Sequence, residues 1–162
     1  MMRIRDVTSG DRAALCGLLR RVNIFEPHEI RVAEELIDQR LAGSTDYLIY
    51  VADEEIEDDG TGRRLAGFIC HGHNPVTDAV HDIYWIAVEP GVQRRGTGRA
   101  LLSYAESRVR EMAGRAITIE TSSRQEYRAA RGLYEACGYS RVAEIADFYK
   151  PGEAMRTYMK FV

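Results

Sequence analysis

The feature that most constrains this chain is an apolar run that leads into a basic, glycine-containing turn and then into an amphipathic helical pattern. We expect a buried strand over residues 81–88 and a helix over residues 96–112, and the turn between them contains Arg94, Arg95, Gly96, Gly98 and Arg99. The first amide groups of a helix have no partner inside it, and the helix dipole adds positive charge there. Glycines let the backbone approach a bulky group closely. The pattern therefore predicts a site for a phosphate or pyrophosphate.

Two common phosphate-binding patterns do not fit this turn. The chain contains no GxxxxGK[ST] run, which a P-loop requires. A dinucleotide fingerprint needs a third glycine, but Leu101 occupies that position and the turn lies past the middle of the chain. An alternative is that the glycines only begin a helix. We favour the anion site because two glycines and three arginines within six residues exceed what helix capping requires.

The rest of the chain alternates between strand and helix patterns. Strands are expected at residues 3–7, 47–52, 65–70, 81–88, 116–120, 140–145 and 155–161, and helices at 8–22, 27–41, 96–112 and 126–136, with a loop containing Pro151 and Gly152 between the last two strands. The order is β-α-α-β-β-β-α-β-α-β-β. It predicts an α+β fold with a mixed sheet and helices on both faces, built from residues 1–162 as one domain.

Composition limits the function classes. Hydrophobic residues make up 45% of the chain and charged residues 29%, which suits a globular core. The formal net charge of −3 disfavours binding to nucleic acid or to an anionic membrane. The longest apolar run is too short to span a bilayer, and the first residues lack the apolar stretch of a signal peptide. We therefore expect a cytoplasmic protein.

Cysteines, histidines and acidic residues give no sign of a metal site. Cys16, Cys70 and Cys137 form no CxxC pair, so we expect small buried hydrophobic residues in a reducing compartment. His71, His73 and His81 lack supporting ligands at metal-binding spacing, and we place them at the surface or the rim of a pocket. The acidic run over residues 53–62 is interpreted as a solvated hairpin loop.

Two separated motifs resemble those of one enzyme family. The first is Gln93-x-x-Gly96-x-Gly98, preceded by Ile86-Ala87-Val88, and the second is Ala130-x-x-Leu133-Tyr134-Glu135-x-x-x-Gly138-Tyr139. Both resemble motifs of the GCN5-related N-acetyltransferases (GNAT), and the chain also resembles a subgroup of small bacterial members. The resemblance implies the three-layer GNAT fold, with a mixed, mostly antiparallel seven-stranded sheet.

The resemblance also implies a site for acetyl-CoA as cosubstrate. In the family the strand before the first motif pairs with the pantetheine arm, that strand and the next one splay apart around the thioester, and the turn binds the pyrophosphate. The cofactor-binding residues implied here are Ile86, Ala87, Val88, Gln93, Arg94, Arg95, Gly96, Thr97, Gly98, Arg99 and Tyr127. Tyr127 stands where the family often has an asparagine, so this chain departs from the pattern there.

Two catalytic residues follow from the same resemblance. Tyr134 matches the tyrosine that protonates the departing CoA thiolate, and a phenol with an ordinary pKa of about 10 can do so. The alternative for Tyr134 is a core tyrosine on an amphipathic helix. Glu120, at the end of its strand, resembles a glutamate used as general base; Asp82, Tyr84 or a water chain are the rivals. Acyl transfer through Cys70 or Cys137 is disfavoured.

The predicted reaction is direct transfer of an acetyl group from acetyl-CoA to a primary amine in a ternary complex. The acceptor would be a small amine or amino acid, or a protein N-terminus or lysine. The resemblance implies acceptor contacts in the link between the first two helices, in the strand over residues 81–88 and in the loop between the last two strands. The residues are Phe25, Glu26, Tyr84 and Asp147. The alternative is a non-catalytic acyl-CoA-binding sensor. The family resemblance also makes a homodimer plausible.

Overall fold

The computed structural model describes residues 1–55 and 62–162. Its sheet has the strand order β1-β2-β3-β4-β5-β7-β6. The strands are β1 (Met2–Asp6), β2 (Leu48–Glu55), β3 (Arg63–His73), β4 (Val80–Val88), β5 (Ala116–Ser122), β6 (Ser140–Lys150) and β7 (Glu153–Phe161). Neighbouring strands are antiparallel except β4 and β5, which are parallel. The predicted element order and the mixed, mostly antiparallel seven-stranded sheet are confirmed.

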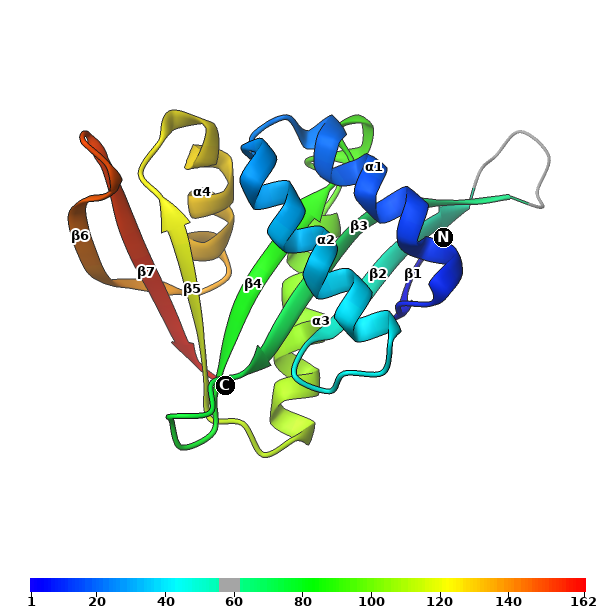
Figure 1. Cartoon of the computed structure of the whole chain (residues 1–162). Helices are drawn as coiled ribbons and strands as arrows, with labels where there is room; N and C mark the ends of the chain where they lie inside the picture. Colours follow the sequence, from blue (N-terminus) through cyan, green and yellow to red (C-terminus); the bar gives the residue numbers. More distant parts are fainter. Residues whose placement is uncertain (56–61) are drawn as a thin grey trace.

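Helices cover both faces of this sheet, as predicted (Figure 1). The α-helices are α1 (Arg12–Val22), α2 (Pro27–Leu41), α3 (Thr97–Glu111) and α4 (Arg128–Ala136), and short 3-10 turns are η1 (Ser9–Asp11), η2 (Pro90–Val92) and η3 (Gln125–Tyr127). One apolar cluster joins α1 and α2 to the sheet, and a second joins α3 and α4 to its other face. In α1, Leu15, Leu18 and Leu19 are fully buried, at the spacing of one helix face.

The second helix shows how local sequence sets its bounds. Pro27 occupies the first helical position, where the missing N–H costs no hydrogen bond. The backbone N–H of Glu26 donates to the carboxylate of Glu29 at 2.6 Å, in a capping box. Gly43, with φ of 101°, follows the end of the helix in a conformation that suits glycine. These signals are local, and the helix has its predicted bounds.

The parallel pair at the centre of the sheet is short. β4 and β5 pair only from Val80 with Ala116 to Ile83 with Ile119, and beyond that point the strands diverge (Figure 1). The register of β4 against β3 skips Tyr84, which marks a β-bulge there. A bulge bends its strand, so this one contributes to the divergence of β4 from β5. A V-shaped gap between β4 and β5 results, as the family resemblance implied.

The last hairpin differs from the prediction. We expected a loop from residue 146 to 154, but β6 reaches Lys150 and β7 begins at Glu153. The β6–β7 register shifts between Ile145 and Lys150, and Asp147 has a left-handed φ of 55°. β6 therefore continues through an irregular segment, where the turn-forming residues of the sequence had predicted a loop.

Two predictions about charged and polar residues were wrong in part. Asp53, expected in a solvated loop, is buried in β2 and accepts a hydrogen bond from Arg5 Nε at 2.8 Å. Residues 56–61 of that predicted loop lie outside the described residues. His71 and His81, expected at the surface or a pocket rim, are buried beside each other, with 3.3 Å between their Nδ1 atoms. His73 is exposed.

The cysteines agree better with expectation. Cys16 and Cys70 are buried and Cys137 is partly buried, and all three are free thiols. Burial raises the pKa of Cys70 to about 12, which keeps this thiol protonated and unreactive. Within residues 1–55 and 62–162, no group of three histidine, cysteine or carboxylate side chains is placed to hold a metal ion. None of the helices described there is long and apolar enough to cross a membrane.

Candidate active site

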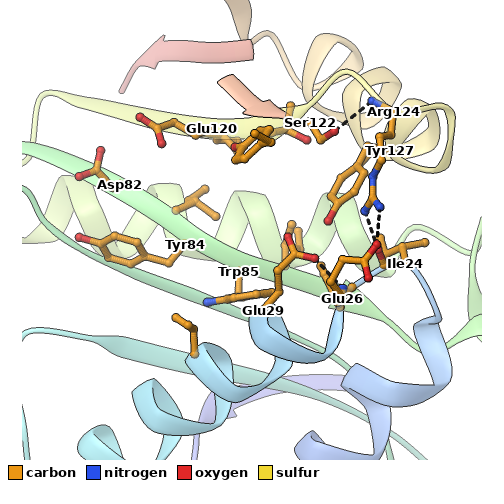
Figure 2. Close-up of a pocket in the computed structure, with 18 of the residues that line it drawn as sticks. Ile24, Glu26, Glu29, Asp82, Tyr84, Trp85, Glu120, Ser122, Arg124 and Tyr127 are labelled. Atoms are coloured by element: carbon orange, nitrogen blue, oxygen red, sulfur yellow. Dashed lines mark hydrogen bonds and ion pairs between the residues drawn. The ribbon is translucent and has the colours of Figure 1, made fainter. Parts of the chain in front are cut away.

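A cavity of about 650 Å³ occupies the gap between β4 and β5 (Figure 2). Its walls come from the link between α1 and α2, from the diverging parts of β4 and β5, from η3 and α4, and from the turn between β6 and β7. Because the two strands lack a shared ladder here, the cavity reaches both faces of the sheet. Side chains from elements far apart in the sequence therefore meet around one space.

On the face of the sheet covered by α4, the central polar group is the phenol of Tyr134. This side chain lines the cavity and is 4% exposed. Its ring lies 5.8 Å from that of Tyr158 and 6.4 Å from that of Tyr139. Burial among these rings raises the pKa of Tyr134 well above its ordinary value, because the charged phenolate is poorly solvated there. The hydroxyl stays protonated at neutral pH and can act as a proton donor.

On the opposite face, Glu120, Asp82 and Tyr84 lie at one end of the cavity (Figure 2). Glu120 is exposed to solvent, whereas Asp82 is partly buried and accepts a hydrogen bond from Thr118 Oγ1. Burial and the negative charge of Asp82 raise the pKa of Tyr84. The sequence proposed all three as rival bases, and the structure brings them to the same end of one cavity.

Aromatic side chains form a wall of the cavity. The ring of Phe25 lies 5.0 Å from that of Trp85 and 6.4 Å from that of Tyr127, in edge-to-face arrangements. Burial raises the pKa of Tyr127 to about 12, so it is neutral at physiological pH. Phe25 was a predicted acceptor contact and Tyr127 a predicted cofactor contact, and they lie together because η3 faces the α1–α2 link.

Sequence reasoning missed Arg124. Its guanidinium donates to the carbonyl of Ile24 at 2.8 Å and to Glu26 Oε1 at 3.1 Å, and it lies 5.2 Å from the ring centroid of Tyr127 (Figure 2). Its Nε atom is 3.4 Å from Glu153 Oε1. The partners lie up to 100 residues away in the chain, so no local pattern could have indicated them.

The basic turn before α3 lies beside this cavity, outside its lining. Gly96 has a φ of 90° and precedes the first helical residue, Thr97, and no side chain caps this helix start. The structure therefore confirms a helix start at this turn, whereas anion binding there stays a prediction. A Cβ added to Gly98 would lie 2.8 Å from Leu133 Cδ2, so Gly98 also allows close packing against α4.

Comparison with known proteins identifies the family. Residues 45–141 match the family model described as an acetyltransferase (GNAT) domain. The chain belongs to the GNAT acetyltransferase family. A solved structure from Desulfovibrio desulfuricans, assigned to the same GNAT family, is 33% identical, with a TM-score of 0.89 and 99% of each chain covered.

Two further proteins are similar over a shorter stretch or at lower identity. The mycothiol acetyltransferase of Beutenbergia cavernae is 35% identical over 96 residues, which are 59% of this chain but only 31% of that protein. Arabidopsis thaliana NAA60, solved in complex with acetyl-CoA, is 16% identical, with a TM-score of 0.80 and coverage of 100% and 99% of the two chains. At this identity the likeness shows a shared fold.

In this GNAT chain, both predicted catalytic residues, most of the predicted acceptor contacts and two of the predicted cofactor contacts line the cavity. Tyr134, Glu120, Phe25, Glu26, Tyr84, Tyr127 and Ile86 all line it. Asp147, a predicted acceptor contact, lies outside the lining, and its Oδ1 accepts a hydrogen bond from the backbone N–H of Gly152 at 2.7 Å. That carboxylate is engaged in the β6–β7 turn.

Proposed function

We propose that this chain is an acetyl-CoA-dependent N-acetyltransferase that transfers the acetyl group directly to a primary amine in a ternary complex. One observation carries the proposal: the cavity between β4 and β5 is lined from both faces of the sheet, by Tyr134 of α4 on one face and by Glu120 of β5 on the other. A thioester reaching the gap from the α4 face and an amine reaching it from the α2 face would meet there.

The residues present suit acetyl-CoA as cosubstrate. The uncapped amide groups at the start of α3, with Arg94, Arg95 and Arg99 nearby, suit a pyrophosphate. The diverging end of β4, at Ile86, Ala87 and Val88, pairs with β3 on one side and has no β5 partner on the other, so this edge suits pairing with the pantetheine arm. Gln93 Nε2 donates to the Val88 carbonyl at 3.2 Å, which ties the turn to this strand. Arabidopsis NAA60, of the same fold, was solved with acetyl-CoA bound.

The chemistry requires proton transfer away from the attacking nitrogen and to the departing thiolate. An amine enters largely as an ammonium ion, so a proton must leave before the nitrogen attacks the thioester carbonyl. We assign this role to Glu120, at the open acceptor face, with Asp82 or Tyr84 as the nearest alternatives. As the carbon–sulfur bond breaks, the thiolate takes a proton from Tyr134, whose raised pKa keeps it protonated until then. The attacking nitrogen loses its second proton as the amide forms, and that proton restores the Tyr134 phenol. No nucleophilic side chain is needed.

The acceptor side suits a cationic amine. Carboxylates of Glu29, Asp82 and Glu120 line the cavity with the aromatic wall of Phe25, Trp85 and Tyr127, while Glu26 and Glu153, also in the lining, pair with Arg124. Aromatic faces and carboxylates together favour an ammonium group. A small amine or amino acid and a protein N-terminus or lysine all carry this group.

Coupled activity and binding measurements test the proposal. Acetyl-CoA and a panel of primary amines should give free CoA thiol only when both substrates are present. Tyr134→Phe should lower turnover by at least about tenfold while acetyl-CoA binding is unchanged. Tyr139→Phe is the matched control, since this second buried phenol lies outside the cavity lining. Equal turnover in the wild type and Tyr134→Phe would refute the acid role, and acetyl-CoA binding without transfer to any amine would favour a non-catalytic sensor.

A separate pair of variants tests the base. Glu120→Gln should lower turnover and remove the acid limb of its pH profile, whereas Asp82→Asn should leave that limb in place. The reverse pattern would assign the base to Asp82.

A further inference from the structure

We propose that Arg124 determines acceptor size: it closes one end of the acceptor side of the cavity, so the acceptor is a small primary amine and not the N-terminus of an extended peptide. This inference rests on the proposed acetyltransferase function and names the substrate class for it.

The Arg124 side chain joins two walls of the cavity. On one wall lies the link between α1 and α2, where the guanidinium donates to the Ile24 carbonyl at 2.8 Å and to the Glu26 carboxylate at 3.1 Å. On the other lies the start of β7, where Glu153 is 3.4 Å from Nε. Figure 2 shows the side chain extending from the turn after β5 toward Ile24 and Glu26. An acceptor leaving the cavity by this route would cross the bridge.

The bridge is held rigidly at its base. Arg131, which is 8% exposed, donates from Nη1 to the carbonyls of Ser122 at 2.6 Å and Arg124 at 2.9 Å. The Arg124 N–H donates to Ser122 Oγ at 3.0 Å, and that hydroxyl donates to Glu153 Oε1 at 2.6 Å. Burial and these charge-assisted bonds fix the backbone from which Arg124 projects. The guanidinium also rests on the face of Tyr127.

The bridge also divides the charge of the cavity. Glu26 and Glu153 are already paired with the protein's own cation, whereas Glu120 and Asp82 lie at the other end (Figure 2). An acceptor ammonium is therefore directed toward Glu120 and Asp82. Any long extension of that acceptor toward Glu26 must displace a guanidinium held by two carboxylates, a carbonyl and a ring. Short acceptors avoid this cost.

Binding of two bisubstrate conjugates tests the inference without turnover. One conjugate joins CoA through an acetyl linker to alaninamide, and the other joins it to the N-terminus of a tetra-alanine amide. The wild type should bind the short conjugate at least about tenfold more tightly than the long one. Arg124→Ala should reduce that preference by at least about fivefold and leave the affinity for CoA itself unchanged. Arg31→Ala, at an exposed arginine of α2, is the control and should keep the wild-type preference.

The outcomes separate this inference from the proposed function. A smaller wild-type preference, or one that persists in Arg124→Ala, would overturn the role of Arg124 while leaving the acetyltransferase proposal in place. Failure of the wild type to bind CoA or either conjugate would overturn both. Glu26→Gln removes the carboxylate partner on the opposite wall and should lower the same preference, so it provides the test if Arg124→Ala does not fold.

Discussion

The buried histidine pair predicts that the protein loses stability on mild acidification. His71 is fully buried, its Nδ1 lies 3.3 Å from that of His81, and its Nε2 has no hydrogen-bond partner among the described residues. Desolvation, with the positive charges of His81 and Arg108, lowers the pKa of His71 to about 4, against 6.5 in the unfolded chain. Between these values the unfolded chain binds a proton that the folded chain does not. Stability is therefore complete above pH 6.5 and is lost as the pH falls.

The size of this effect follows from the two pKa values. Between pH 7 and pH 5 the free energy of unfolding should fall by about 2 kcal/mol at this site. For a chain of this length, that corresponds to a fall in melting temperature of about 4–8 °C. Thermal melts of the wild type and of His71→Leu at both pH values measure it, with His28→Leu, at an exposed histidine, as the control. His71→Leu should lose less stability on acidification than the wild type and the control. Equal losses in all three proteins would refute the reasoning.

Three substitutions, with a fourth as control, test the packing around the site. Gly67→Ala should lower the free energy of unfolding by about 3 kcal/mol, because its Cβ would lie 2.7 Å from a main-chain carbonyl oxygen of β4; urea titration measures this. Gly96→Ala should cost about 1–2 kcal/mol from its left-handed φ, whereas Gly91→Ala, with open space around it and no such φ, should cost almost nothing. Arg131→Met should cost about 3–4 kcal/mol, because it removes two charge-assisted hydrogen bonds to main-chain carbonyls of the turn after β5, and an unchanged denaturation midpoint would contradict this.

The sequence predicted helix and strand bounds correctly where the residues that set them lie within a few positions of the element's end. The bounds of α2 were correct because Pro27 and Gly43 act within a few residues of the helix ends. The turn at Gly96 was identified as a helix start for the same reason. The length of β6 was wrong because its continuation past Asp147 depends on pairing with β7, which turn-forming residues in the sequence conceal.

For the candidate site as well, the sequence could not identify residues whose roles depend on contacts between distant segments. The family resemblance identified Tyr134 and Glu120 as candidates, and both line the cavity. It could not identify Arg124, whose partners are distant in sequence, and it offered no reason to expect His71 in the interior. The cytoplasmic location and the homodimer remain predictions from the sequence.

The central claim is that the gap between β4 and β5 receives acetyl-CoA, and its most direct test is ligand-induced stabilisation. Thermal melts would be recorded with acetyl-CoA, CoA, NAD, ATP and no ligand. A ligand present at about 100 times its Kd adds roughly 2.7 kcal/mol of stability, or about 5–11 °C in melting temperature for a chain of this size. Stabilisation by acetyl-CoA and CoA, but not by NAD or ATP, is the predicted result. No shift with millimolar acetyl-CoA or CoA would contradict the claim, and the acetyltransferase proposal would fail with it.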